Sequence, residues 1–248
     1  MSKIYNYENF ISEHLTQFGS LLQLESEYKK LLEEDATNPQ LDIICDKICK
    51  LLHLGNYQII KGIVNVEDTV MLDSRSLHGS KKIQTIPVKF GIIEGSFFCD
   101  RNALISLDGS PKQVSQTFDC HMNDLTTLTG CPEIIGSDFH CGENLLTSLV
   151  DGPKSVNGFY SFSNNHIYEL TGFCEHFDGE VFFHNNPVEE VLDLFGETGD
   201  KLGKVIDLLN EWDVIRQNEI VLDRLIDCGY QFGLEIPDTI TFKNYKVI

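Results

Sequence analysis

Histidine and carboxylate side chains recur at regular intervals in the middle of this 248-residue chain, at Asp100, Asp119, His121, Asp138 and His140. Imidazole and carboxylate groups are suitable ligands for a divalent metal ion. No nucleophile with an orienting base accompanies them, so we expect no catalytic residues and no required cofactor. A metal or small-ligand site at this cluster stays open as an alternative to solvated pairs between neighbouring strands.

These residues belong to an internal repeat of 21 residues, which is the strongest pattern in the sequence. The repeated unit reads aromatic-x-Cys-x-x-Asn-x-Leu-x-x-Leu and corresponds to the leucine-rich-repeat pattern, with an aromatic residue in its first strand position. The columns in register are Phe97, Phe118, Phe139, Tyr160 and Val181; Cys99, Cys120, Cys141, Phe162 and Phe183; Asn102, Asn123, Asn144, Asn165 and Asn186; and Leu104, Leu125, Leu146, Ile167 and Val188.

The repeat predicts an α/β fold, namely a short leucine-rich-repeat solenoid of about six rungs with helical N- and C-terminal flanks. Alternating apolar positions predict a short strand in each unit, and successive strands are expected to stack into a parallel sheet. The recurrent asparagine is expected to hydrogen-bond backbone groups at the turn after each strand. An imperfect earlier unit is expected to contain a strand at Val70–Leu72 and an insertion around Ser74–Lys82, after a short strand near Ile63–Val66.

The chain is divided by these patterns into a helical hairpin over residues 1–58, the solenoid over 59–188 and a helical cap over 189–248. Apolar residues at helical spacing predict one helix over residues 7–35, which Gly19 is expected to bend or divide. A second helix is expected to begin with Pro39 in its first turn. In the cap we expect three helices, the last over Asn218–Cys228, and a short strand within Ile240–Val247.

A formal net charge of −19 disfavours direct binding to nucleic acid, because that affinity depends largely on Lys and Arg side chains. The same charge would suit a basic partner or an acidic decoy that imitates nucleic acid. The chain has no secretory leader pattern and no apolar stretch long enough to cross a bilayer, so we expect a cytoplasmic protein without a membrane partner. Cysteines that alternate with apolar residues within one repeat column are expected to be reduced core residues.

The exposed face of the strands is the expected binding surface, because its side chains are rigidly held and free of core packing. Three aromatic residues on this face, Phe98, Phe159 and Phe182, favour contact with a partner protein. Self-association, or cover by the N-terminal hairpin, is the rival explanation. The residues expected to bind a partner are Phe98, Asp100, Asp119, His121, Asp138, His140, Phe159, Ser161, Phe182 and His184.

Residues 59–248 resemble the small leucine-rich-repeat proteins encoded by tailed bacteriophages. The resemblance is carried by the segments Ile86–Gly91, Phe118–Leu128 with its copies, Glu211–Arg216 and Asn244–Ile248. It implies a viral protein made in the host cytoplasm. Combined with the strand face, it predicts a non-enzymatic module that engages a host protein, such as a defence factor. The alternatives are an acidic decoy of nucleic acid and a small-ligand or metal-binding protein.

Overall fold

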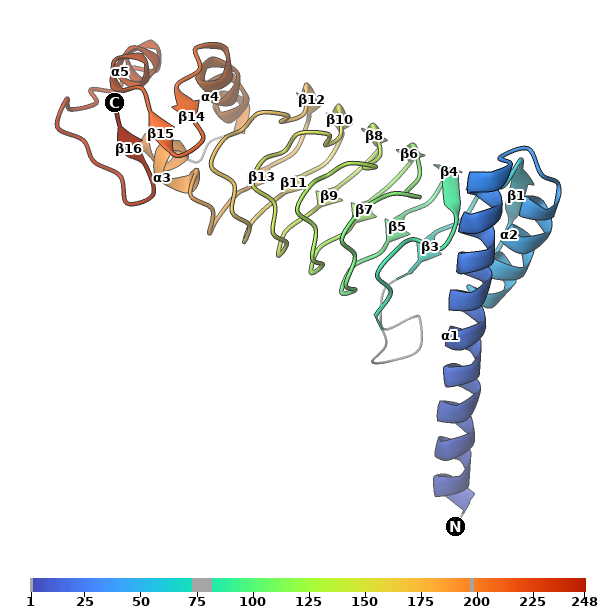
Figure 1. Cartoon of the computed structure of the whole chain (residues 1–248). Helices are drawn as coiled ribbons and strands as arrows, with labels where there is room; N and C mark the ends of the chain where they lie inside the picture. Colours follow the sequence, from blue (N-terminus) through green and yellow to red (C-terminus); the bar gives the residue numbers. More distant parts are fainter. Residues whose placement is uncertain (1, 73–81, 197–198) are drawn as a thin grey trace.

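The computed structural model describes residues 2–72, 82–196 and 199–248, with side chains placed for residues 18–72, 82–196 and 201–248. Short strands are stacked in two rows through the middle of the molecule (Figure 1). Helices α1 and α2 lie at one end of the stack and helices α3 to α5 lie at the other. The α/β class, the parallel strands and the helical flanks are therefore as expected.

One row is a six-stranded, wholly parallel sheet in which each strand is two residues long. Neighbouring strands pair in the register of the repeat, as in Phe97 with Phe118 and Tyr160 with Val181. Each strand places one side chain in the core and the next on the outer face, because side chains alternate along a strand. The strands are β3 (Val70–Met71), β5 (Phe97–Phe98), β7 (Phe118–Asp119), β9 (Phe139–His140), β11 (Tyr160–Ser161) and β13 (Val181–Phe182).

A second row of strands is also present, and of its members the sequence analysis predicted only β2, near Ile63–Val66. It contains β2, β4, β6, β8, β10 and β12 in parallel, and β1 pairs antiparallel with β2, so this seven-stranded sheet is mixed. The first three strands of this sheet are β1 (Tyr57–Ile60), β2 (Ile63–Val66) and β4 (Lys89–Ile93). The repeated short strands are β6 (Gln113–Val114), β8 (Ile134–Ile135), β10 (Ser155–Val156) and β12 (His176–Phe177).

The core between the two sheets is formed by the repeat columns. Phe97, Phe118, Phe139 and Tyr160 are fully buried, and the ring centroids of successive members lie 4.9 to 6.0 Å apart. All eight cysteines are free thiols, as expected. Burial raises the pKa of the thiols in the repeat column, so these side chains are neutral and pack as small apolar groups.

The N-terminal flank is a helical hairpin of α1 (Ser2–Glu34) and α2 (Gln40–Leu51). Gly19 was expected to bend or divide the first helix, but α1 runs through it as a single helix. The hydroxyl of Tyr28 donates a hydrogen bond of 2.8 Å to the carbonyl of Gly62, which fixes α1 against the first strands. The proposed insertion at 74–82 lies, except for Lys82, outside the described residues.

The C-terminal flank contains α3 (Glu189–Leu192), a 3-10 turn η1 (Asp193–Phe195), α4 (Gly199–Glu211) and α5 (Leu222–Gln231). The prediction of a helix over 218–228 was wrong at its start. Residues before α5 form a hairpin of β14 (Ile215–Arg216) and β15 (Glu219–Ile220), with which β16 (Lys246–Val247) pairs in parallel. In the described part of the chain, no helix is both long enough and apolar enough to span a membrane.

Candidate binding face

The outer face of the six-stranded sheet presents one side chain from each strand. Register places these side chains in a single row, with the neighbouring strands about 4.8 Å apart. Five of the six were expected to bind a partner. All six are half-buried or exposed, whereas the side chains that precede the first five are fully buried. In strand order the row is Met71, Phe98, Asp119, His140, Ser161 and Phe182.

Aromatic rings form a continuous group at the C-terminal end of this row. Phe159, which immediately precedes β11, lies between the rings of His140 and Phe182. Its ring centroid is 4.7 Å from that of His140 and 5.7 Å from that of Phe182, and both contacts are edge-to-face. Phe182 is 37% exposed. The N-terminal hairpin lies at the opposite end of the stack, so it does not cover this group (Figure 1).

Phe98 is separate from the aromatic group and lies at the N-terminal end of the row. Its register partner is Met71, which is 47% exposed. Sequence analysis missed Met71 because the spacing from Met71 to Phe98 is 27 residues, which breaks the 21-residue period. The apolar parts of the face are therefore two groups with polar side chains between them.

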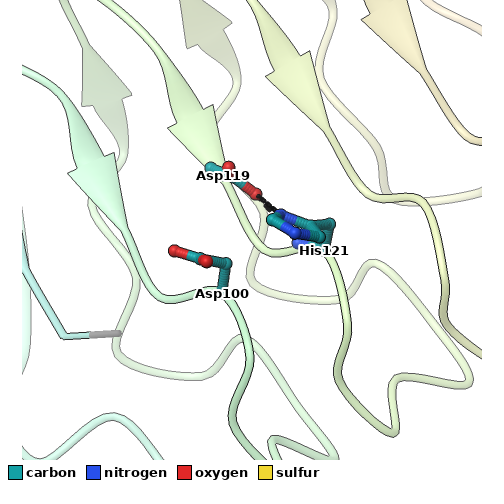
Figure 2. A group of neighbouring side chains, drawn as sticks. All are labelled: Asp100, Asp119 and His121. Carbon is teal, nitrogen blue, oxygen red and sulfur yellow. Dashed lines mark hydrogen bonds and ion pairs between the residues drawn. The ribbon is translucent and has the colours of Figure 1, made fainter. Parts of the chain in front are cut away.

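The polar centre of the face is formed by Asp100, Asp119 and His121, which lie together where β5 and β7 end (Figure 2). One potential ligand atom from each of the three residues lies within 4.8 Å of the other two. Nδ1 of His121 is 2.6 Å from Oδ1 of Asp119, and the same oxygen accepts a 3.0 Å hydrogen bond from the backbone N–H of His121. Two neighbouring strands thus converge on one small group of metal-compatible side chains.

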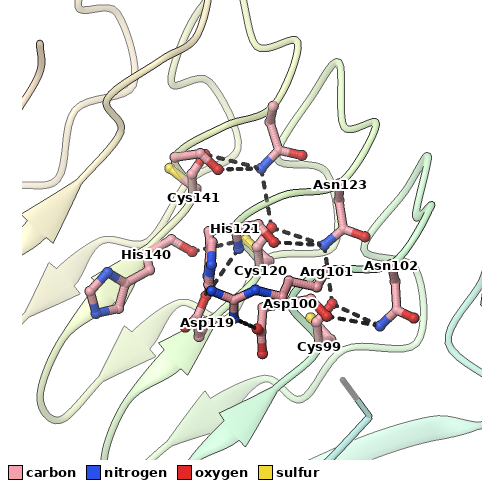
Figure 3. Close-up of polar contacts among 12 residues, drawn as sticks. Cys99, Asp100, Arg101, Asn102, Asp119, Cys120, His121, Asn123, His140 and Cys141 are labelled. Carbon is pink, nitrogen blue, oxygen red and sulfur yellow. Dashed lines mark hydrogen bonds and ion pairs between the residues drawn. The ribbon is translucent and has the colours of Figure 1, made fainter. Parts of the chain in front are cut away.

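Asp100 was expected to be exposed on this face, and that prediction was wrong, because the side chain of this residue is almost completely buried, with 1% of the residue exposed. The strand alternation stops at this point, since the next residue, Arg101, adopts a left-handed backbone conformation with φ of 55°. Nη1 of Arg101 lies 2.6 Å from Oδ2 of Asp100 and covers it (Figure 3). The analysis of the sequence did not single out Arg101, because the residues at its repeat position share no chemistry.

Protein groups already balance part of the charge in this cluster. The hydrogen bond that the ring of His121 donates to Asp119 raises the pKa of His121, although partial burial of the ring opposes this effect. The ion pair between them is consequently fully formed below the ordinary pKa of histidine. It is lost as the pH rises through the raised value in the folded protein.

The remaining predicted residues are not part of this cluster. Oδ1 of Asp138 accepts a 3.1 Å hydrogen bond from the backbone N–H of Phe159, so Asp138 positions the aromatic group. The ring of His140 contacts that of Phe159 edge-to-face, as described above. His184 lies beyond β13, where its Nδ1 is 3.0 Å from Oε1 of Glu189. The predicted five-residue Asp and His cluster is therefore reduced to two of its aspartates and one histidine.

The repeated asparagines hold the turns that end at this face, as the sequence predicted. Nδ2 of Asn123 donates hydrogen bonds of 3.0 Å to the carbonyls of both Cys99 and Cys120, and its Oδ1 accepts one of 3.0 Å from the backbone N–H of Leu104 (Figure 3). The same pattern recurs in the other units, and all five side chains are buried. This ladder makes the face rigid.

Comparison with known proteins does not add a relative to this picture. No protein-family model, no curated protein and no solved structure matches the chain.

Proposed function

We propose that this chain is a non-enzymatic protein-binding module, built as a short leucine-rich-repeat solenoid, that engages a partner through the outer face of its six-stranded sheet. The observation that supports this proposal is the edge-to-face group of His140, Phe159 and Phe182. Partly exposed aromatic rings on a rigid scaffold lose little conformational freedom on binding. Such rings are the usual anchors of protein interfaces.

The charge of the protein favours a basic partner. A net charge of −19 increases the rate of encounter with positively charged surfaces and opposes contact with nucleic acid. On the face itself, Asp119 and His121 separate the two apolar groups and can fix the orientation of the partner. We infer that apolar contact supplies most of the affinity, whereas the polar centre supplies specificity.

The class of partner that we propose is supported by the resemblance of residues 59–248 to small repeat proteins of tailed bacteriophages. On this proposal the chain is a viral protein that acts in the host cytoplasm and binds a host protein, such as a defence factor. Direct binding to nucleic acid, a membrane or a catalytic cofactor forms no part of it.

The proposal predicts that a Phe98→Ala, His140→Ala, Phe182→Ala triple variant loses its partner. An affinity purification from bacterial lysate, with mass spectrometry, would identify a protein retained by the wild type. Titration of that purified protein should then show affinity weakened by at least about 30-fold in the triple variant, because loss of an interface anchor costs about 2 kcal/mol or more.

A matched control is available on the other sheet, where Ile92 and Ile134 are similarly exposed. An Ile92→Ala, Ile134→Ala variant should keep the wild-type affinity. Equal binding by the triple variant would contradict the proposal. Binding that depends on salt and on scattered carboxylates, but not on Phe98 or Phe182, would instead favour an acidic decoy. Concentration-dependent dimers of the wild type alone would indicate self-association.

A divalent metal ion is a second candidate ligand, favoured by the convergence of Asp100, Asp119 and His121 within 4.8 Å. If the cluster binds metal, calorimetric titration with Zn²⁺ or Mn²⁺ should give one ion per chain. His121→Gln should weaken binding by about tenfold or more. The control His184→Gln should bind like the wild type.

The affinity for the metal ion should increase as the pH rises through the raised pKa of His121, since the ion must displace a proton. Unchanged affinity in His121→Gln would exclude this site.

A further inference from the structure

The last strand of the six-stranded sheet has an unpaired outer edge. In this sheet the backbone N–H groups of each strand donate to carbonyls of the next strand in sequence. Thus Tyr160 donates to Glu180 and Phe162 donates to Phe182, each at 2.9 Å. The equivalent donors of the last unit are the N–H groups of Val181 and Phe183, and neither has an acceptor among the described residues.

The donors of this edge differ from the backbone donor that follows them. The N–H of Asn185, which is the next donor in the same direction, binds Oε2 of Glu189 at 2.7 Å. A side chain from α3 therefore satisfies one donor at the end of the repeat, while the donors of Val181 and Phe183 have no acceptor in the described part of the chain. An exposed row of N–H groups is a template for a further strand.

A hollow adjoins the unpaired edge. It has a volume of about 210 Å³, and its apolar lining includes Phe177, Val181, Phe183 and Leu202. In the earlier units the aromatic residue at the position of Val181 is completely buried by the unit that follows it, whereas Val181 itself is only half-buried. The hollow thus lies where the apolar side chain of a further strand would pack.

The approach to this edge is acidic. Glu180 immediately precedes β13, Asp178 lies two residues before Glu180, and both are exposed. Within the parts of the chain that the structure describes, neither side chain forms an ion pair. Opposite charges on neighbouring strands stabilise their pairing, so Lys or Arg is favoured in a segment that lies here.

We propose that the outer edge of β13 binds an extended segment of a partner protein as an additional parallel strand, with an apolar side chain in the hollow and Lys or Arg beside Asp178 and Glu180. Carbonyl groups two residues apart in such a segment match the donors of Val181 and Phe183. Main-chain hydrogen bonds would provide general affinity, and the hollow and the acidic pair would select the sequence. This edge is separate from the strand face, so the two proposals can fail independently.

The first test uses an acetylated and amidated peptide of alternating lysine and valine, with alternating glutamate and valine as one control and lysine alone as another. In ¹⁵N-labelled protein, the lysine–valine peptide is expected to shift the backbone amide signals of Val181 and Phe183. It should also slow their hydrogen exchange about tenfold or more, because an amide in a strand pair exchanges only when the pair opens. The two control peptides should not produce these effects.

A variant of the edge provides the second test. Val181→Pro removes one outward N–H and keeps the carbonyls of Glu180 and Phe182 that accept the bonds from β11. It should weaken peptide binding about tenfold, as expected for one lost hydrogen bond. The control Ile134→Ala, at an exposed position on the other sheet, should bind the peptide like the wild type.

Several outcomes would overturn the proposal. They are absence of binding, equal binding by Val181→Pro, equal effects of the lysine-only peptide, or shifts centred on Phe98 and Phe159 instead of the edge. If Val181→Pro does not fold, the exchange measurement on the wild type decides alone: slow exchange of Val181 and Phe183 without peptide would contradict an open edge.

Discussion

Replacing Asn123 with alanine is expected to lower the free energy of unfolding by about 3 kcal/mol. The substitution removes the acceptor of the backbone N–H of Leu104, which is buried and has no other partner in the described residues. It also removes one of the two asparagine donors to the carbonyls of Cys99 and Cys120. A buried donor without an acceptor costs more than the hydrogen bond itself contributes, so the loss should be large. Urea denaturation followed by circular dichroism would measure it.

The control for this measurement is Asn157→Ala. Asn157 is exposed, and its side chain makes one long contact, of 3.5 Å, with Ser155. Its replacement should change the free energy of unfolding by less than about 0.5 kcal/mol. Similar losses in the two variants would mean that Asn123 does not support the stacked turns through its buried hydrogen bonds.

Phe139→Ala is expected to cost about 3 to 5 kcal/mol of stability, the largest effect we expect from a single side chain. The ring of Phe139 is fully buried, with its centroid 6.0 Å from that of Phe118 and 4.9 Å from that of Tyr160. Truncation would leave a cavity in a stack whose backbone is held on both sides, so little collapse can fill it. The midpoint of urea denaturation should fall accordingly.

Phe182→Ala is the comparison that relates this stability to function. Phe182 lies on the outer face and is 37% exposed, so its loss should cost less than half as much stability as that of Phe139. If the proposed binding face is correct, the same variant should retain its fold and lose affinity for its partner. Equal destabilisation by the two variants would show that the outer aromatic group is needed for folding, and it would weaken the argument for an interface.

Much of the candidate face could be predicted because a strand has a period of two residues. Once Phe118 and its equivalents were placed in the core, Asp119, His140 and Phe182 had to point outwards. The prediction of an outward side chain failed at the next outward position, Asp100, which is two residues after Phe98. Asp100 follows the strand, where the left-handed conformation of Arg101 turns the chain and ends the alternation. Residue spacing carries no information about such a turn until the backbone geometry is known.

The sequence by itself determined the 21-residue unit, the parallel register of the six-stranded sheet, the buried asparagine ladder and the helical flanks. These features are local or periodic: the flanks follow from the spacing of apolar residues along one segment, and the others recur in every copy of the motif. Only the tertiary structure decided the second sheet, the reduction of the Asp and His cluster to three residues, and the open edge of β13. Each of these depends on which segments meet across the stack, and two-residue strands such as Gln113–Val114 are too short to be recognised before their neighbours are in place.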